Sequence, residues 1–192
     1  MRTQRPILMS APMVRAILSG TKTQTRRVVR WPWNHWPKTD ELDNLGDMAS
    51  LWVRGKKITC PYGQPGDGLW VKETGWERPE RTPRMMREGA DTWEPYYYDA
   101  DDGFTEADHE QFKEWGFKRR PSIFMPRWAS RITLEVTDVR VERLNDASDY
   151  DLLCEGVESR NIYVELWNRL NEKRGYSWAK NPWVWVLEFR KV

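Results

Sequence analysis

Apolar residues fall into short runs along this chain, separated by polar stretches, and their spacing predicts the regular elements. Strands are indicated where apolar or β-branched residues alternate or run together, at residues 21–29, 69–74, 96–98, 132–141 and 183–189. The run at 132–141 fits either one long bent strand or two short ones. Helices are indicated at residues 12–19, 146–156 and 158–173.

The predicted helices carry signals at their ends. Pro12 suits the first turn of the first helix, and Gly20 suits its end. Ser148 is a candidate N-cap for the second helix, and Gly156 is its expected end. The third helix is amphipathic, and its predicted apolar face consists of Ile162, Leu166, Trp167 and Leu170.

The remaining stretches, residues 30–60 and 77–122, are polar and contain many prolines and aromatic residues. We expect them to be two loop-rich insertions in a single domain that spans residues 1–192. Few helices and several strands predict an α+β fold, in which a small mixed β-barrel or curled sheet carries helices at its edge.

Charge is nearly balanced overall, at +2, but it is distributed unevenly. Residues 1–30 carry seven basic side chains and no acid, whereas residues 91–114 carry nine acids and one lysine. The sequence therefore predicts one basic face, which would attract phosphates, and one acidic face.

The two cysteines and two histidines lie far apart in the sequence, at Cys60, Cys154, His35 and His109. This spacing does not fit a metal site, and we expect neither a metal nor a cofactor. Lone cysteines, the absence of a secretion signal and the absence of a long apolar run predict a soluble cytoplasmic protein that does not enter a membrane.

The segment that follows the first helix, GTKTQTRR from Gly20 to Arg27, concentrates candidate chemistry. In an extended strand Lys22, Gln24 and Arg26 lie on one side and the threonines on the other. Lys22 and Thr25 therefore share a site only if the strand begins with a twist or bulge, or if Lys22 lies in the preceding turn.

This segment resembles the Gly-x-Lys-Thr-x-Thr-x-Arg signature of the ASCH family, a branch of the PUA-like barrel superfamily. Residues 66–71 (GDGLWV), 144–156 and 184–189 (VWVLEF) also resemble family segments, in the same order. The chain looks most similar to the larger ASCH-domain proteins of bacteriophages and prophages, which implies a PUA-like fold in a bacterial or phage-infected cell.

One ASCH enzyme is a bacterial amidohydrolase that removes the acetyl group from N(4)-acetylcytidine with a lysine, a threonine and a glutamate. The resemblance carries these catalytic positions over to Lys22, Thr25 and Glu155, and a neighbouring arginine to Arg27. It implies binding of a modified nucleoside or nucleic-acid base, with possible amide hydrolysis. The two insertions depart from the family pattern, so the resemblance does not extend to the substrate of that enzyme.

Amide hydrolysis requires a nucleophile, a proton acceptor and a group that stabilises the oxyanion. Lys22 could activate Thr25 if its pKa is lowered, or Glu155 could activate a water directly. Further candidate ligand-binding residues are Arg26, Arg27, Glu73 and Arg127, and Trp128 could stack on a base. Trp31, Trp33 and Trp36 lie in similar polar stretches, where a tryptophan either stacks on a base or anchors a loop.

Two rival functions remain open at this point. The protein could be a non-catalytic reader of RNA or modified DNA, with basic residues as phosphate contacts and tryptophans as stacking planes. Alternatively, a phage protein could dock a host partner through its acidic insertion. The sequence does not indicate an oligomeric state.

Overall fold

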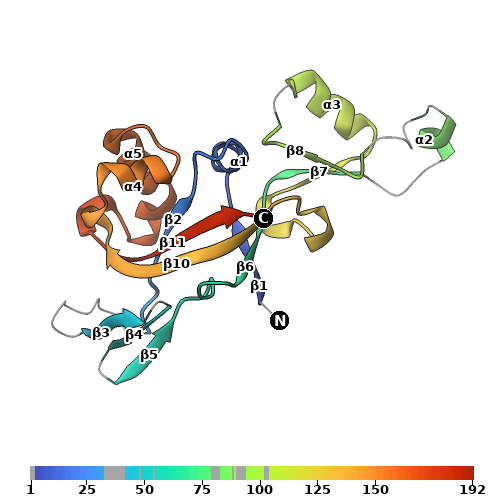
Figure 1. Cartoon of the computed structure of the whole chain (residues 1–192). Helices are drawn as coiled ribbons and strands as arrows, with labels where there is room; N and C mark the ends of the chain where they lie inside the picture. The colour runs from blue at the N-terminus through green and yellow to red at the C-terminus, as the bar shows by residue number, and fades with distance from the viewer. Residues whose placement is uncertain are drawn as a thin grey trace. The chain divides into compact units, whose positions relative to one another are not determined.

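The structure of the protein is a computed structural model (Figure 1), which describes residues 3–32, 42–47, 49–53, 55–78, 83–87, 89, 94–101 and 104–192. For residues 42–47 and 84–85 it describes the backbone alone. The predicted stacking residues Trp33 and Trp36, and parts of both insertions and of the acidic segment, lie outside the described residues.

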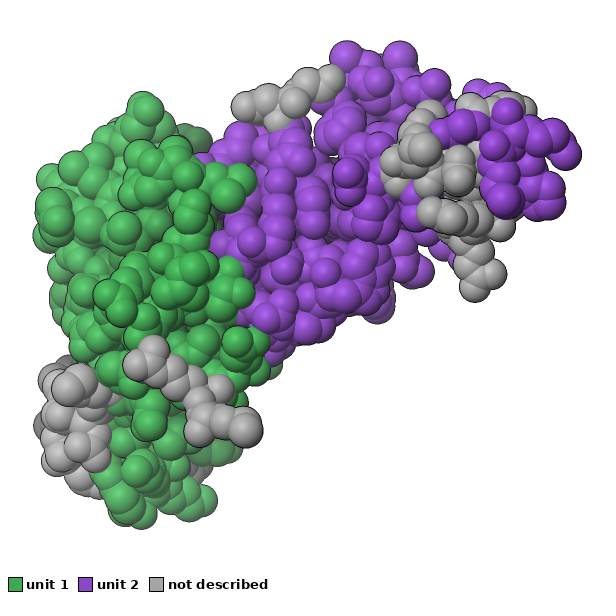
Figure 2. Space-filling model, turned by 45° about the vertical axis from the view of Figure 1, so that its right-hand side comes forward, with its two compact units in different colours: residues 1–5, 16–69, 133–192 green, residues 6–15, 70–132 purple. Residues whose placement is uncertain are grey.

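The chain divides into two compact units, which are coloured separately in Figure 2. Unit 1 comprises residues 1–5, 16–69 and 133–192, and unit 2 comprises residues 6–15 and 70–132. Unit 2 therefore contains the second predicted insertion, and each unit is described by itself below.

The largest sheet has the strand order β1-β6-β10-β11-β2. Its strands are β1 (Gln4–Leu8), β6 (Gly68–Lys72), β10 (Thr133–Arg143), β11 (Trp183–Lys191) and β2 (Gln24–Val28). The α+β class is confirmed. Within the described residues β1 and β2 are the two ends of this order, so of the two expected forms, a small barrel or a curled sheet, no closed barrel is seen.

Strand β11 lies between β10 and β2 and is antiparallel to both. Its residues from Trp183 to Leu187 are all buried, as a run without alternation predicts for a central strand covered on both faces. Strand β10 is one long strand with a register irregularity between Val136 and Asp138, which settles the open choice between one strand and two.

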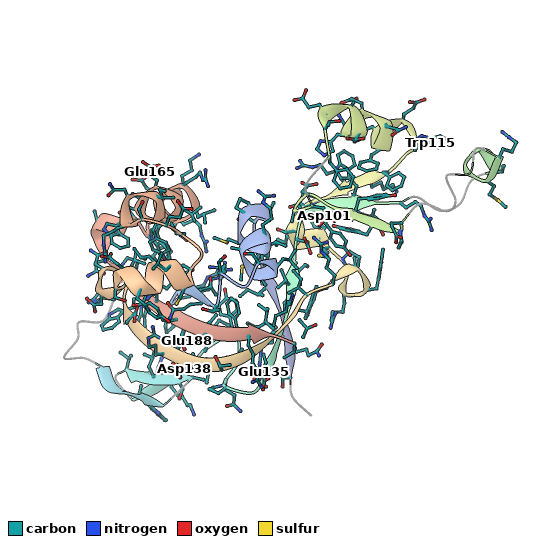
Figure 3. The ribbon with its side chains drawn as sticks, turned by 45° about the horizontal axis from the view of Figure 1, so that its top comes forward. Asp101, Trp115, Glu135, Asp138, Glu165 and Glu188 are labelled. Carbon is teal, nitrogen blue, oxygen red and sulfur yellow. The ribbon has the colours of Figure 1, made fainter. Side chains whose placement is uncertain are left out.

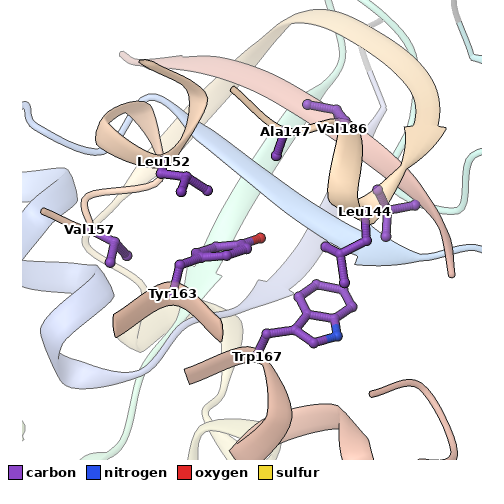
Figure 4. Packing of buried hydrophobic residues seen from close by; sticks show 8 residues of the cluster. Leu144, Ala147, Leu152, Val157, Tyr163, Trp167 and Val186 are labelled. Carbon is purple, nitrogen blue, oxygen red and sulfur yellow. The ribbon is translucent and has the colours of Figure 1, made fainter. Parts of the chain in front are cut away.

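Two helices, α4 (Asp149–Cys154) and α5 (Arg160–Asn171), contribute Leu152, Tyr163 and Trp167 to an apolar cluster that also includes Val184 and Val186 of β11 (Figure 4). The predicted N-cap Ser148 is confirmed, since its hydroxyl accepts a hydrogen bond from the amide of Asp151 at 3.1 Å. Gly156 follows α4 with a positive φ of 76°, as expected for a helix end.

Half of the predicted apolar face of α5 is confirmed, since Trp167 is buried and Leu166 packs partly buried against the same cluster. The other half is wrong, because Ile162 and Leu170 are 52% and 49% exposed and Tyr163 is buried in their place. The sequence pattern counts tyrosine as polar and therefore misses Tyr163. This residue is buried because its hydroxyl has an internal hydrogen-bond partner, the Glu155 carboxylate.

The first insertion is not simply loop-rich, because its described residues form a three-stranded antiparallel sheet. This sheet has the order β3-β4-β5 and consists of β3 (Leu42–Asp47), β4 (Ser50–Val53) and β5 (Lys56–Thr59). Leu51 and Val53 are buried while Trp52 points outward, so β4 has the two-residue period of a strand covered on one face.

The second insertion also contains regular structure in place of the expected loops. Its described elements are β7 (Gly75–Glu77), α2 (Pro83–Arg87), β8 (Tyr96–Tyr98), α3 (Glu106–Glu114) and β9 (Lys118–Arg120). The strands pair in the order β8-β7-β9. Trp76, Phe112 and Phe117 are buried together and form a small aromatic core. Strand β8 confirms the strand predicted at residues 96–98, whereas β7 and β9 were not predicted, because strands of three residues are too short to give a periodic signal.

Candidate functional site

Lys22 enters the site from a turn and not from a strand. Helix α1 (Ala11–Leu18) is followed by Gly20, whose φ of 80° reverses the chain. The amide of Lys22 then donates to the carbonyl oxygen of Ala16 at 2.9 Å, and Lys22 forms an isolated antiparallel bridge with Glu155. Strand β2 begins only at Gln24.

The Lys22 side chain is fully enclosed and uses all three donors of an ammonium group. Its Nζ atom donates to the carbonyl oxygen of Gln24 at 2.8 Å, to the carbonyl oxygen of Glu155 at 2.8 Å and to the Glu155 carboxylate at 2.7 Å. The exposed fraction of this side chain is 0%. Three acceptors around one nitrogen fit the charged form of the lysine.

The Glu155 carboxylate is bonded from three directions. One oxygen accepts from Lys22, and the other accepts from Arg26 Nη1 and from the Tyr163 hydroxyl, both at 3.3 Å. These partners come from the turn before β2, from β2 itself and from α5. The carboxylate is therefore buried with a countercharge and hydrogen bonds, which a buried charge requires.

Arg26 and Gln24 extend the cluster along the same face of β2. Arg26 Nη1 donates to the Gln24 amide oxygen at 2.7 Å, and Arg26 Nη2 lies 2.7 Å from the Glu142 carboxylate. Arg26 is buried, and its guanidinium donates hydrogen bonds to acceptors inside the protein. This arrangement makes Arg26 a residue that positions Glu155.

Burial and charge shift the pKa values in this cluster in different directions. Burial lowers the pKa of Lys22, and the Glu155 carboxylate opposes that change. Burial alone would lower the pKa of Arg26, but Glu142 and Glu155 raise it. Burial raises the pKa of Tyr163, and the neighbouring Glu155 charge adds to the effect.

Towards the solvent the cluster continues through Arg140 on β10. Arg140 lies 2.5 Å from Glu188, 3.0 Å from Asp151 and 3.7 Å from Asp138. Asp138 and Glu188 are register partners on the neighbouring strands β10 and β11 (Figure 3). Acids thus outnumber cations at this end of the cluster.

Gly156 lets the end of α4 approach the Lys22 turn. A Cβ atom at this position would lie 2.9 Å from the Cβ of Ala16 and 3.3 Å from the Cβ of Lys22. Neither distance leaves room for a side chain, and the φ of 76° also favours glycine. The glycine therefore permits the bridge between Lys22 and Glu155.

Thr25 and Arg27 alternate to the opposite face of β2 from Gln24 and Arg26. Thr25 is buried and is paired in register with Leu187 of β11. Arg27 is half-buried, and its guanidinium lies 6.0 Å from the centre of the Tyr62 ring. The structure thus brings Lys22, Arg26 and Glu155 into one hydrogen-bonded cluster. Thr25 alternates to the other face of the strand, whereas the charge of Arg27 adds to burial in lowering the pKa of Lys22.

The other predicted site residues belong to unit 2. Glu73 is buried and accepts two hydrogen bonds from Arg131, at 3.1 and 3.0 Å. Burial raises the pKa of Glu73, and Arg131 opposes that change. Arg127 and Trp128 are exposed in a short 3₁₀ turn.

Two hollows border the Lys22 turn in unit 1. The larger, of about 460 Å³, is lined by Gly20, Thr21, Thr23, Leu153, Cys154, Gly156, Val157 and Glu158. The smaller, of about 260 Å³, lies beside Lys22, Thr23 and Phe189. The larger volume is within the range of small-molecule sites. The residues that line it include both sequence neighbours of Lys22, Thr21 and Thr23, and both sequence neighbours of Glu155, Cys154 and Gly156.

The cluster includes residues that the sequence analysis did not single out: Gln24, Tyr163, Glu142, Arg140 and Asp151. Alternation placed Gln24 on the side of Lys22 and Arg26, so that signal was available. Tyr163, one position from the expected apolar face of α5, was hidden by the error in that face. Glu142 and Asp151 give no local signal, because their role depends on how β10 and α4 pack.

In the described part of the chain, no group of three or more histidine, cysteine or carboxylate side chains could hold a metal ion. Both cysteines are free, and burial raises the pKa of Cys60 to about 11. None of the helices described is long and apolar enough to span a bilayer. Compared with known proteins, the chain matches no family model, no curated protein and no solved structure.

Proposed function

We propose that the protein binds a modified nucleoside or nucleic-acid base in unit 1, with a PUA-like ASCH fold, and hydrolyses an amide on it. The observation that carries the proposal is the Lys22–Glu155 pair. An ammonium and a carboxylate, 133 residues apart in sequence, lie 2.7 Å apart beside a hollow of about 460 Å³. The ASCH resemblance marks the same two residues.

In the proposed reaction, Glu155 takes a proton from a water molecule that attacks the acyl carbon. Lys22 stabilises the negative charge on the carbonyl oxygen, and the C–N bond breaks as the protonated Glu155 passes its proton to the leaving amine. The products are a free carboxylic acid and a free exocyclic amine. Arg26 and Tyr163 orient the Glu155 carboxylate, and this route needs no nucleophile from Thr25.

Access to the pair requires a movement, because the Lys22 side chain is fully enclosed and its three donors are occupied. We propose that the base occupies the larger hollow. The amide then replaces one acceptor of Lys22 when the turn at Gly20 and the end of α4 separate.

The test is to incubate the protein with N(4)-acetylcytidine and to measure free cytidine by chromatography. Hydrolysis should be lost in Glu155→Gln and in Lys22→Met. It should be retained in Glu165→Gln, which changes an exposed glutamate of α5. Circular dichroism verifies that each variant is folded. Turnover that survives in a folded Lys22→Met variant would remove Lys22 from the mechanism.

The filled donors of Lys22 favour a second candidate, a non-catalytic reader of a modified base. In that case wild-type protein binds the nucleoside in a calorimetric titration but releases no cytidine. The two outcomes are distinguished in the same sample, since binding and turnover are measured separately.

A further inference from the structure

A surface of unit 2 gathers exposed apolar side chains around two cations. We name it the basic–aromatic surface, and it consists of Trp70, Lys72, Ile123, Phe124, Arg127 and Trp128. Single exposed apolar residues are ordinary on protein surfaces, but a contiguous group marks a binding site. Here Phe124 is 68% exposed, and Ile123 and Trp128 are each 59% exposed.

Four members of this surface, Trp70, Lys72, Ile123 and Arg127, are linked by contacts. Lys72 Nζ donates to the carbonyl oxygen of Ile123 at 2.5 Å and lies 5.3 Å from the centre of the Trp70 ring. The guanidinium of Arg127 lies 5.4 Å from the same ring. Trp70 is therefore approached by two cations.

The backbone explains why the apolar side chains point outward. Two consecutive 3₁₀ turns, Ser122–Phe124 and Arg127–Ala129, form this segment. Met125 and Ala129 are buried beside Tyr96 and anchor the turns in unit 2. The core is thus filled from the inner side of the segment, and Phe124 and Trp128 are not needed for it.

Trp128 is also held in place. Its ring meets the ring of Tyr96 edge-on, with the centroids 6.2 Å apart and an interplanar angle of 87°. Tyr96 is buried, so the Trp128 ring has a packing partner on its inner side, while more than half of the Trp128 surface is exposed to solvent. A fixed aromatic plane stacks on a ligand at low entropic cost.

The charge of the segment points to an anionic partner. Residues 115–134 contain five basic residues and no acid. Three of the five are paired within unit 2: Arg119 with Asp99, Arg120 with Glu77, and Arg131 with Glu73. Arg127, together with Lys72, lies over Trp70, at the surface that carries the exposed aromatic rings.

We infer that the basic–aromatic surface binds single-stranded nucleic acid. Trp128 and Phe124 offer planes on which bases stack, and Lys72 and Arg127 offer cations for the phosphates, which is the combination such ligands require. A purely apolar partner would gain no electrostatic attraction from the two cations that lie over the Trp70 ring. This inference concerns unit 2 and does not depend on hydrolysis at Lys22.

The test uses the full chain and two fluorescein-labelled probes of about 12 nucleotides, an oligouridylate and an oligothymidylate, whose length fits common site sizes. Fluorescence anisotropy at low salt should show binding. We expect Trp128→Ala and Phe124→Ala each to weaken it by about 5- to 100-fold. The control is Trp52→Ala, which changes a partly exposed tryptophan of β4 in unit 1.

Removing a cation should change the salt dependence. Lys72→Gln should reduce the slope of log affinity against log salt by about 0.7, the value for one phosphate contact on a single strand. Lys57→Gln, on the exposed strand β5 of unit 1, should leave the slope unchanged. Comparing the two probes shows whether the 2′-hydroxyl contributes.

Two results would overturn the inference: wild-type protein that binds neither probe at low salt, or aromatic variants that bind as the Trp52→Ala control does. If binding is absent and sedimentation shows an oligomer that Phe124→Ala dissociates, the surface belongs to a protein contact instead.

Discussion

Lys22 holds Glu155 twice, once through the main-chain carbonyl oxygen and once through the carboxylate. The first bond ties the end of α4 to the turn before β2, whatever the side chain at position 155. The second compensates the charge of Glu155. A substitution of Lys22 therefore removes both the charge pair and this structural tie, whereas a substitution of Glu155 removes the charge pair alone.

Breaking this buried pair from one side should be costly. Lys22→Met leaves the Glu155 carboxylate with Arg26 and Tyr163 only, and we expect a loss of about 3–5 kcal/mol in the free energy of unfolding. Glu155→Gln leaves Lys22 as an unpaired buried cation. The double variant should lose less than the sum of the two single losses, as measured by urea unfolding. Strictly additive losses would contradict a direct coupling.

Gly156 gives a second prediction at the residue scale. Gly156→Ala places a Cβ atom 2.9 Å from Ala16 at a φ of 76°, and we expect a loss of about 2–4 kcal/mol from backbone strain and overpacking together.

The matched control for Gly156→Ala is Gly20→Ala. Gly20 has a similar φ of 80° but no atom within 4 Å of the added Cβ, so this change measures the backbone strain alone, about 1–2 kcal/mol. Equal losses in thermal unfolding would show that the contact with Ala16 does not matter.

For single residues, the sequence predicted the side chains that β2 and its preceding turn supply to the cluster, but not those that other elements supply. Alternation along residues 21–29 correctly placed Lys22, Gln24 and Arg26 on one side, and it also gave the objection to Thr25. It could not supply Glu142 or Tyr163, because those side chains arrive through the register of β10 and the packing of α5.

Among the elements, α4 is the one whose end supplies Glu155, and its start is held by a reciprocal cap. Ser148 and Asp151 exchange hydrogen bonds between side chain and backbone. Burial alone would raise the pKa of Asp151, but the hydrogen bonds from Ser148 and the charge of Arg26 lower it to about 2.

This shift predicts how stability depends on pH. A carboxyl whose folded pKa is about 2 and whose unfolded pKa is about 3.9 stabilises the fold above pH ~4 and loses that contribution as the pH falls towards 2. Ser148→Ala should cost about 1 kcal/mol at pH 7 and should flatten the loss between pH ~4 and ~2.

Urea unfolding at several pH values checks this prediction. Ser159→Ala is the control, since Ser159 caps α5 through the amide of Ile162. That variant should lower stability at every pH and leave the acid slope unchanged. An unaltered slope in Ser148→Ala would mean that Ser148 does not set the pKa of Asp151.

Elements with a long or well-capped pattern were predictable from the sequence, and of the three-residue strands described only β8, a run of three tyrosines, was predicted. The buried run at 183–189 and the cap at Ser148 each carry a local signal that tertiary structure did not override. Strands β7 and β9 have three residues each and depend on pairing with each other. The sheet β3-β4-β5 was hidden because β3 (LDNLGD) and β5 (KKIT) are short and rich in residues that strands disfavour.

At the scale of the whole molecule, each compact unit has a core of its own. The aromatic cluster around Phe112 lies wholly in unit 2, and the cluster around Trp167 lies wholly in unit 1. Contiguous cores of this kind open separately when one of them is weakened.

Hydrogen exchange tests that separation. Phe112→Ala removes the centre of the unit 2 cluster, where large-to-small changes cost about 3–5 kcal/mol. Amides of β7, β8 and β9 should exchange faster, while those of β10 and β11 keep their protection. Trp167→Ala should give the reverse pattern. Equal loss of protection in β11 for Phe112→Ala would show that the chain opens as one cooperative body.

The enclosed ammonium of Lys22 has a consequence for the reactivity of the chain. Acylating reagents attack the uncharged, accessible amines of lysines, and Lys22 offers neither property while its three hydrogen bonds are formed. Its modification must wait until the turn at Gly20 and the end of α4 come apart. The rate at which a reagent labels Lys22, relative to an exposed lysine such as Lys57, therefore reports how often this part of unit 1 opens.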